Sequence, residues 1–247
     1  MSHISMPAKA GNHEGRAPVE FDGALLPVIQ TTISFAIVSR ANDVERLISL
    51  LKSLAPLKDE ITLVLDNDDE GIRNRLAGYA DTVVQMPGKG CFEEHSADIF
   101  YFCAKDWIFR IDDDETLSAN CTRGLLERYV SNRLINAWWI PRKWFVDNTH
   151  YICSGPWFPD YQLRLFRNIP GILTLPSRIH EPLRVLGRNE HLDEIWLEHW
   201  DLLTPRETRE KKTAHYNTLF PNNGCTSFYL YEDESYTWIP PPPPTHF

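Results

Sequence analysis

The 247-residue sequence contains no run of about 18 consecutive apolar residues, so it predicts no transmembrane helix. Residues 1–20 are polar and lack the apolar core of a secretory signal peptide. The five cysteines are odd in number and widely spaced, and no two of them form a CxxC pair, which favours reduced thiols over disulfides. These absences predict a cytoplasmic protein, which would work at a membrane only from its surface.

Glycine-rich phosphate-binding motifs are also missing. Neither GxGxxG nor GxxxxGK followed by Ser or Thr occurs, so dinucleotide binding of the Rossmann type and P-loop chemistry are unsupported. Positive charge is in deficit, and a formal net charge of −9 disfavours a nucleic-acid partner. The composition, with 43% hydrophobic and 24% charged residues, is that of a globular protein large enough for one α/β domain.

Buried strand patterns alternate with helical patterns from residue 33 onward. The alternation predicts parallel βαβ units, and so an α/β fold whose sheet is covered on both faces. The predicted strands are 33–38, 61–65, 82–86, 107–111, 138–140 and 161–166, and the predicted helices are 44–54, 71–79, 92–104, 116–132 and 205–220. We expect an N-terminal extension over 1–30, the domain over 31–220, and an aromatic tail over 221–247 that closes with the polyproline II run Pro240–Pro244.

Polar residues follow four of these strands at the point where each strand ends. Ligands of open α/β sheets bind beyond the carboxyl ends of the strands. The sequence therefore predicts a binding site built from the residues at those ends, which are Ser39, Arg40, Asp66, Lys89 and the run Asp112-Asp-Asp-Glu115.

Carboxylates in this set suit a nucleotide and a hard cation. Asp112 and Asp114 form a DxD pattern, and Mg²⁺ or Mn²⁺ binds through one or two carboxylates together with substrate phosphates. The alternative is an acidic turn that caps the following helix. Asp66 could accept the N–H of a uracil ring, or it could be a turn-forming residue of Asp66-Asn-Asp-Asp69.

The sequence resembles the family-2 glycosyltransferases of the GT-A fold, with the bacterial surface-polysaccharide and lipopolysaccharide members nearest. The resemblance covers about residues 33–216 and departs at the Asp66–Asp69 turn and in the tail. The matching residues are Phe35-Ala-Ile-Val-Ser-Arg-Ala-Asn-Asp43, Leu65-Asp66, Asp106-Trp-Ile-Phe-Arg-Ile-Asp-Asp-Asp-Glu115, Pro141-Arg-Lys-Trp-Phe145, Pro159-Asp-Tyr-Gln-Leu-Arg-Leu-Phe-Arg167, Ile179-His-Glu181 and Leu197-Glu-His199.

The resemblance implies a Rossmann-like GT-A domain that acts as a metal-dependent, inverting, hexosyltransferase-like enzyme. Its donor would be a nucleotide-sugar, first of all a UDP-sugar, and its acceptor a hydroxyl of a glycan or lipid-linked molecule. The implied roles are nucleotide-sugar binding for Ser39, Arg40, Asp66, Lys89, Asp112 and Asp113, Mn²⁺ or Mg²⁺ binding for Asp112, Asp114 and His199 with His180 as a weaker candidate, and proton abstraction for Asp160. Glu181 competes with Asp160 as the base or orients the acceptor.

Two further groups of residues have a structural interpretation beside the functional one. At least half of the aromatic residues Trp138, Trp139, Trp144, Phe145, Tyr151 and Trp157 are expected to fill the core rather than stack on a sugar. The basic residues Arg206, Arg209, Lys211 and Lys212 could face an anionic lipid or an anionic acceptor, but they alternate with Glu207 and Glu210, which favours a solvated helix face.

Two other functions stay open on the sequence. A nucleotidyltransferase shares the α/β layout and the acidic site, but it would carry a glycine-rich loop after the first strand, where this chain has Ser39-Arg-Ala-Asn-Asp43. A non-catalytic binding module would use the acidic cluster only as structure and present its proline-rich tail to a partner.

Overall fold

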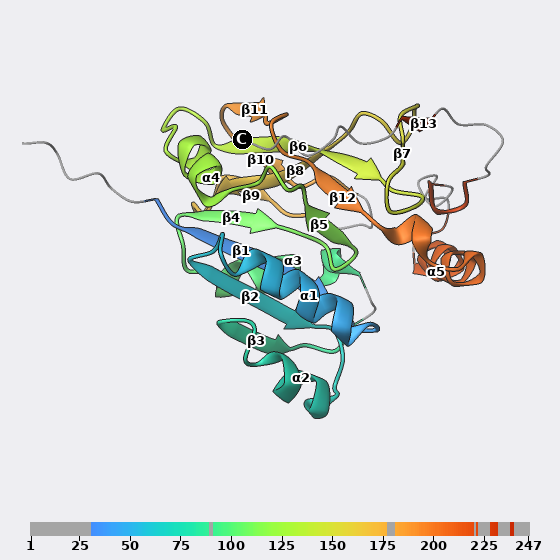
Figure 1. The fold of residues 1–247 in the computed structure, drawn as a ribbon. Helices are drawn as coiled ribbons and strands as arrows, with labels where there is room; N and C mark the ends of the chain where they lie inside the picture. The colour runs from blue at the N-terminus through green and yellow to red at the C-terminus, as the bar shows by residue number, and fades with distance from the viewer. Residues whose placement is uncertain are drawn as a thin grey trace, which may run out of the picture. The chain divides into compact units, whose positions relative to one another are not determined.

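A nine-stranded mixed sheet forms the centre of the fold, with strand order β3-β2-β1-β4-β8-β6-β12-β5 and β11 paired to β6 (Figure 1). The computed structural model describes residues 31–88, 91–176, 181–219, 221, 228–231 and 238–239. Residues 1–30, Lys89, His180 and Pro240–Pro244 lie outside the described residues. Thr31–Phe247 forms one compact unit.

The strands of the main sheet alternate with helices in the first half of the chain, as the sequence predicts. Two small antiparallel pairs, β10-β9 and β13-β7, lie outside this sheet. The elements are β1 Ile33–Ser39, α1 Val44–Leu54, β2 Glu60–Leu65, α2 Glu70–Leu76, β3 Thr82–Gln85, α3 Phe92–Phe102, β4 Trp107–Arg110, β5 Glu115–Leu117, α4 Arg123–Val130, β6 Ala137–Trp144, β7 Tyr151–Ile152, β8 Asp160–Arg167, β9 Leu173–Thr174, β10 Arg184–Val185, β11 Asn189–His191, β12 Leu197–His199, η1 Asp201–Leu203, α5 Arg206–Leu219 and β13 Trp238–Ile239.

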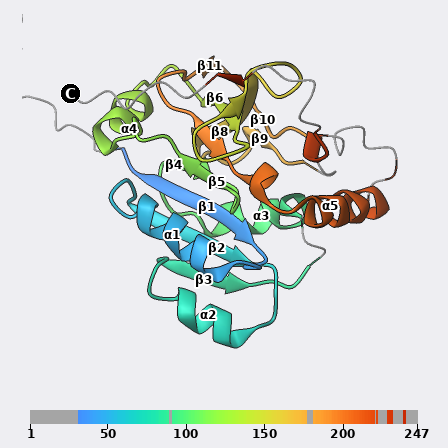
Figure 2. The same ribbon diagram turned by 45° about the vertical axis from the view of Figure 1, so that its right-hand side comes forward.

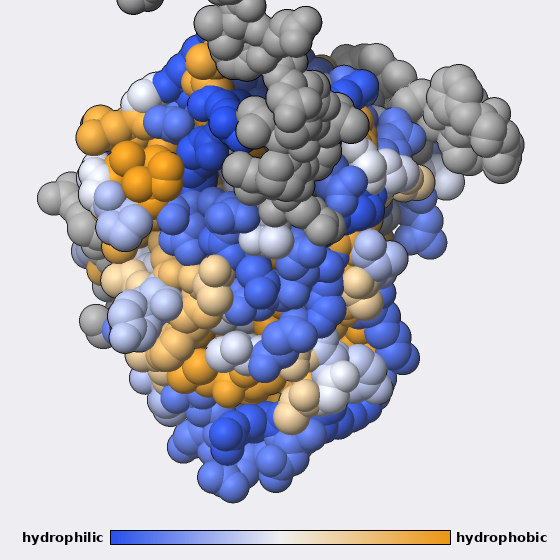
Figure 3. Space-filling model, turned by 90° about the vertical axis from the view of Figure 1, so that its left-hand side faces the viewer, coloured by the Kyte–Doolittle hydropathy of each residue, from blue (hydrophilic) through white to orange (hydrophobic). Residues whose placement is uncertain are grey.

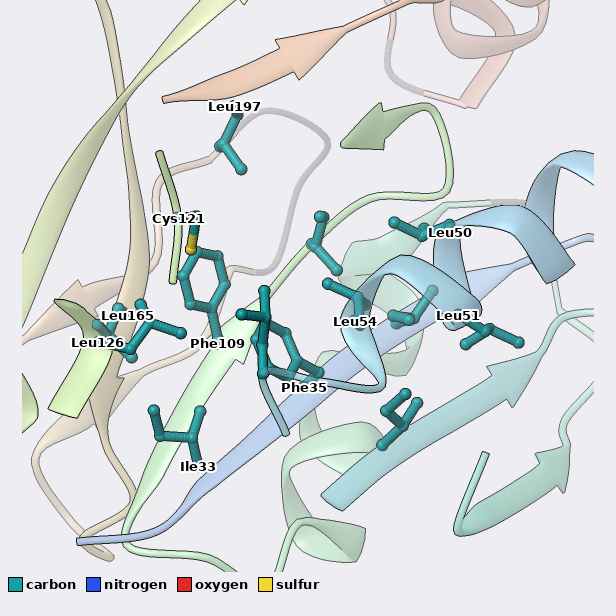
Figure 4. Packing of buried hydrophobic residues seen from close by; sticks show 14 of the residues in the cluster. Ile33, Phe35, Leu50, Leu51, Leu54, Phe109, Cys121, Leu126, Leu165 and Leu197 are labelled. Atoms are coloured by element: carbon teal, nitrogen blue, oxygen red, sulfur yellow. The ribbon is translucent and has the colours of Figure 1, made fainter. Parts of the chain in front are cut away.

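The two faces of the sheet follow the two-residue periodicity of its central strands. Phe35 of β1 and Phe109 of β4 stack on each other with ring centroids 5.2 Å apart and pack against Leu51 and Leu54 of α1 (Figure 4). Their sequence neighbours point the other way, and Ile108 packs with α3 instead. Helices α1, α2 and α4 therefore contribute to one core and α3 to the core on the opposite face (Figures 1 and 2).

The predicted α/β class with a mostly parallel sheet is confirmed. β3, β2, β1 and β4 run parallel, and β11 and β12 run parallel to β6. β8 pairs antiparallel with both β4 and β6 and so connects the first half of the chain to the second. Figure 3 shows the side from which the parallel strands start, where hydrophilic residues predominate and separate apolar patches lie between them.

One predicted helix is wrong over its first half. Residues 116–132 were expected to be helical, but Glu115–Leu117 is the strand β5, and helix α4 begins only at Arg123. β5 pairs with β12, which lies 82 residues further along in the sequence, and this long-range pairing overrides the local helical pattern. Thr122 then starts α4, because its hydroxyl accepts the backbone N–H of Leu125.

Four cysteines among the described residues are free thiols, namely Cys91, Cys103, Cys121 and Cys153. This agrees with the expectation of reduced cysteines, while Cys225 lies outside the described residues. Burial raises the pKa of Cys103 and that of Cys121 to about 12, so these two are inert packing residues. In the part of the chain that the structure describes, no helix has the length and apolar character needed to cross a membrane.

Candidate active site

A cleft of about 870 Å³ opens at the edge where β1, β2 and β4 end. Parallel strands bring their carboxyl ends to one edge, so residues far apart in the sequence meet there. Nine of the predicted site residues line this cleft: Ser39, Arg40, Asp66, Asp112, Asp113, Asp114, Asp160, Glu181 and His199. The other two, Lys89 and His180, lie outside the described residues.

Ser39 at the end of β1 connects this strand to Asp113 and to the backbone of Ala41 through two hydrogen bonds. Its hydroxyl donates to Oδ2 of Asp113 at 2.5 Å and accepts the backbone N–H of Ala41 at 2.9 Å. Ala41 has φ 54°, a left-handed conformation that costs a non-glycine residue ~1 kcal/mol or more. Burial, together with the neighbouring charge of Asp114, raises the pKa of Asp113 to about 6.

Asp66 at the end of β2 is buried, and only one of its two carboxylate oxygens has a hydrogen-bond donor among the described residues. Its Oδ1 accepts the backbone N–H of Gly88 at 2.5 Å and lies 3.6 Å from Nε2 of His95. Its Oδ2 has no hydrogen-bond partner among the described residues. A Cβ at Gly88 would lie 2.6 Å from Nε2 of His95, so any other residue there would displace the His95 side chain. An acceptor of this kind suits a donor N–H of a bound ligand.

Asp112 is held by two arginines. Its Oδ1 accepts from Arg110 at 2.8 Å and its Oδ2 from Arg164 at 2.6 Å. Burial alone would raise the pKa of Asp112, but Arg110 and Arg164 outweigh it and hold that pKa well below its usual range. Arg164 lies in the middle of β8 with its side chain 1% exposed, and the same guanidinium nitrogen contacts Glu115 at 2.6 Å.

Asp114 pairs with a lysine from the last described helix. Nζ of Lys212 in α5 lies 3.1 Å from Oδ2 of Asp114 and 3.0 Å from Oδ1 of Asp201 in η1. Burial would raise the pKa of Asp114, whereas His199 and Lys212 lower it, and the lowering prevails. Because burial lowers the pKa of His199 to about 3, that ring is neutral at pH 7. Lys212 is therefore the cation that pairs with Asp114.

His199 is buried at the end of β12. Its ring stacks on Trp144 with centroids 4.1 Å apart, and its Nδ1 accepts the backbone N–H of Asp201 at 3.3 Å. An imidazole that is neutral and accepts at Nδ1 carries its proton on Nε2.

Asp160 begins β8 and its carboxylate is positioned by three side chains. Oδ2 accepts from Nε of Arg142 and from the indole Nε1 of Trp144, both at 2.8 Å, and Oδ1 accepts from Gln162 at 2.6 Å. Burial would raise the pKa of Asp160, but Arg142 and these hydrogen bonds lower it. Asp160 is therefore a charged, fixed carboxylate. Glu181 lies in the same cleft and is partly exposed.

The aromatic residues divide between cleft and core, as expected. Trp139 and Trp144 line the cleft, whereas the other four are buried and do not, namely Trp138, Phe145, Tyr151 and Trp157. Two aromatic residues of the tail, Phe228 and Tyr229, line it as well. Their carbonyl oxygens accept from Nε1 of Trp157 at 3.0 Å and from Arg209 at 2.6 Å.

The prediction of a solvated basic helix at 205–220 is wrong for two of its four cations. Arg209 is buried and donates to the carbonyl oxygen of Tyr229, and Lys212 is partly buried and lines the cleft. Lys211 lines the cleft as well, but it stays exposed. The sequence holds a signal for this face, because Thr208, Lys212 and Tyr216 recur every four residues and all three line the cleft. The interleaved glutamates obscured that spacing.

A divalent metal does not fit the residues that were expected to hold it. Asp112 gives both oxygens to arginines, Asp114 pairs with Lys212, and Nδ1 of His199 accepts the backbone N–H of Asp201. Within the described ranges, no three His, Cys, Asp or Glu side chains are grouped so as to hold a metal ion. The acidic cluster is instead neutralised by side-chain cations.

Comparison with known proteins finds no matching family model and no matching curated protein. Two solved chains of TarS from S. aureus share 13% and 14% identity with this chain, with TM-scores of 0.47 and 0.49. Each match covers 81% of this chain, and 69% and 42% of the respective TarS chains.

Two other solved enzymes are similar over about half of this chain. A glucosyl-3-phosphoglycerate synthase from Mycobacterium tuberculosis, solved with Mn²⁺ and UDP-glucose, shares 17% identity at a TM-score of 0.35, over 47% of this chain and 44% of its own. A 4-diphosphocytidyl-2C-methyl-D-erythritol synthase from Anaerococcus prevotii shares 16% identity at a TM-score of 0.37. That match covers 56% of this chain and 72% of the synthase chain.

Proposed function

We propose that this chain is a glycosyltransferase that moves a sugar, as a hexosyl unit, from a nucleotide-sugar to a hydroxyl acceptor with inversion. The observation that supports this most is the convergence of three carboxyl strand ends on one cleft of about 870 Å³. Pockets for small ligands measure about 300–1,000 Å³, so a nucleotide-sugar fits this volume. UDP-sugars are the first donors to test.

The nucleotide would lie over the ends of β1 and β2. Oδ2 of Asp66 is a buried acceptor that would take the N–H of a uracil ring. Ser39 and Asp113 would meet the ribose, and Arg40 is an exposed cation at the rim, within reach of phosphate. Lys89, which follows the third strand, remains part of this proposal from its sequence position alone.

The acceptor would enter from the side of β6 and β8. In one displacement the acceptor oxygen forms its bond to the anomeric carbon. The bond from that carbon to the phosphate oxygen breaks, and its electron pair leaves with the nucleoside diphosphate. The acceptor proton passes to a carboxylate, Asp160 in our assignment, with Glu181 as the alternative base. Asp160 suits the role because Arg142 and Trp144 hold its carboxylate, charged, at the cleft.

No step of this reaction is assigned to a metal, since Asp112, Asp114 and His199 do not fit one. The proposed location is the cytoplasm, and a lipid-linked acceptor would bring the protein to a membrane surface. The free thiols of the described cysteines are compatible with a reducing compartment.

Product analysis over a panel of nucleotide-sugars tests this proposal. Each UDP-, GDP-, CDP- and dTDP-sugar is incubated with the chain, and the released phosphates are identified. The proposal predicts a nucleoside diphosphate and a free or transferred sugar with no pyrophosphate. Pyrophosphate formed from a nucleoside triphosphate and a sugar phosphate would identify a nucleotidyltransferase. Binding of a nucleotide without any turnover would identify a binding module.

A further inference from the structure

We infer that Lys212 is the resident cation of this site, in the position where a divalent metal was expected, and that its ammonium group neutralises the diphosphate of the donor. The inference rests on the proposed function. The sequence predicts a metal at the DxD of Asp112 and Asp114, but in the structure both carboxylates are paired with side-chain cations.

The ammonium group is shared between two carboxylates. Asp114 comes from the turn between β4 and β5 and Asp201 from η1, and their oxygens lie 3.1 Å and 3.0 Å from Nζ of Lys212. A bridging metal would take the same kind of position between carboxylates of separate elements. An ammonium has three N–H donors, and these two contacts use two of them. The third can donate to a phosphate oxygen in the cleft that Lys212 lines.

Of the side-chain cations that pair with Asp112 and Asp114, Lys212 is the most accessible to a ligand. Its side chain is 27% exposed, whereas that of Arg164, which pairs with Asp112, is 1% exposed. Arg110 pairs with Asp112 as well, and its guanidinium lies 3.6 Å from the ring centroid of Phe92. Among the described residues the geometry therefore directs the charge of Lys212, more than that of Arg164 or Arg110, toward a ligand.

The surroundings of Lys212 keep its charge and fix its position. The ring of Tyr229 lies 4.7 Å from Nζ, and helix α5 is fastened by the bond from Arg209 to the carbonyl of Tyr229. The carboxylates of Asp114 and Asp201 lie 3.1 Å and 3.0 Å from Nζ and compensate its positive charge. An ammonium held in place beforehand stabilises a developing diphosphate charge without reorganisation.

A titration with Mn²⁺ alone, followed by calorimetry or by the electron spin resonance of the free ion, tests the inference without any substrate. Wild type is expected to bind no Mn²⁺ at micromolar concentrations, because Lys212 occupies the carboxylates. Lys212→Met keeps the length of the side chain and removes its charge, so Asp114 and Asp201 become available, and Mn²⁺ affinity should rise. Lys52→Met, on the exposed face of α1, is the matched control and should behave as wild type.

Donor turnover in EDTA gives the second measurement. Wild type and Lys52→Met should release the same amount of nucleoside diphosphate with EDTA as with Mn²⁺. Lys212→Met should lose ~10²–10³-fold in turnover in EDTA, and Lys212→Arg should retain part of it. Circular dichroism must show that the variants are folded. If Lys212→Met does not fold, the turnover of wild type in EDTA decides whether the inference holds.

Two outcomes overturn the inference while leaving the proposed function intact: tight Mn²⁺ binding by wild type with turnover lost in EDTA, or full turnover by folded Lys212→Met. A different result would end the proposed function, namely that wild type turns over no nucleotide-sugar with or without Mn²⁺. The inference then falls with it, whatever the Mn²⁺ titration shows.

Discussion

The indole Nε1 of Trp144 donates a hydrogen bond to Oδ2 of Asp160 at 2.8 Å. The same oxygen accepts from Arg142, so two donors fix the direction in which this carboxylate presents its remaining lone pairs. Asp160→Asn keeps the size of the side chain but removes its capacity to take a proton. We expect kcat to fall by ~10²–10⁴-fold, the usual contribution of a general base, while donor affinity hardly changes. Steady-state kinetics and calorimetry with UDP provide the two values.

Glu181→Gln is the matched variant for the alternative base. If Asp160 is the base, this variant should raise the KM for the acceptor and leave kcat within a few-fold. Loss of kcat in Glu181→Gln, with Asp160→Asn still active, would reverse the assignment and make Asp160 a positioning residue.

Asp114→Ala should strongly reduce transfer while the protein stays folded. Asp114 holds the ammonium of Lys212 together with Asp201, and one carboxylate alone positions it less well. We expect a loss of about 10²-fold in kcat and a melting temperature close to wild type, because Lys212 keeps Asp201 as a partner. Asp68→Ala, at an exposed position of the β2–α2 turn, is the control. Unfolding of Asp114→Ala would show that Asp114 is needed for the fold rather than for the reaction.

Asp113 should make stability depend on pH in a defined direction. Its pKa is raised to about 6 by burial and by Asp114, against a usual value of 3.8. A raised carboxyl pKa means that the folded protein holds the proton more tightly, so this contribution is complete below pH 3.8 and is lost as pH rises through 6. Asp113→Asn still accepts from Ser39 and never ionises. The melting temperature of Asp113→Asn, relative to that of wild type, should therefore rise between pH 4 and pH 6. The difference should stay constant above pH 6.

The size of this effect is roughly 1–3 kcal/mol at neutral pH, since each unit of pKa corresponds to ~1.4 kcal/mol. Melting curves of both proteins over pH 4–8 measure it. A constant difference between the two across this range would show that the carboxyl of Asp113 titrates normally.

A pair of truncations separates the two ends of the tail. Deleting residues 240–247 should leave donor hydrolysis unchanged, because the proline run cannot supply backbone hydrogen bonds and lies beyond the family resemblance. Deleting 227–247 removes Phe228 and Tyr229 from the cleft and breaks the contacts of their carbonyls with Trp157 and Arg209. Because Tyr229 is buried, we expect a loss of several kcal/mol in stability and a sharp fall in turnover. Equal turnover in both truncations would show that the segment at 228–231 is dispensable.

The sequence predicts the first half of this fold well because its helices and strands are set by local periodicity. The carboxyl ends of β1, β2 and β4 follow from that alternation, and with them the meeting of Ser39, Asp66 and Asp112 in one cleft. β5 could not be predicted in this way, since its partner is β12 and its own three residues carry no strand pattern.

Charge partners are the part of the site that sequence reasoning missed. Arg164 lies 52 residues from Asp112, and Lys212 lies 98 residues from Asp114, so each pairing depends on the folded topology. The sequence identifies the acids by their strand ends. The cations have no comparable marker, because Arg164 looks like one alternating residue of a strand and Lys212 like one charge of a mixed helix face.

The antiparallel pairing of β8 with both β4 and β6 has a mechanical consequence for catalysis. A single hydrogen-bonded sheet extends from β3 to β12, and so runs under both the proposed donor side and the proposed acceptor side of the cleft. The two walls of the cleft therefore cannot rock apart about a hinge, as the lobes of a two-domain enzyme do. Any opening that admits substrate or releases product has to come from segments mounted on the sheet. The rate of product release should thus respond to changes in α5 and in the contacts of residues 228–231, and not to changes within the sheet.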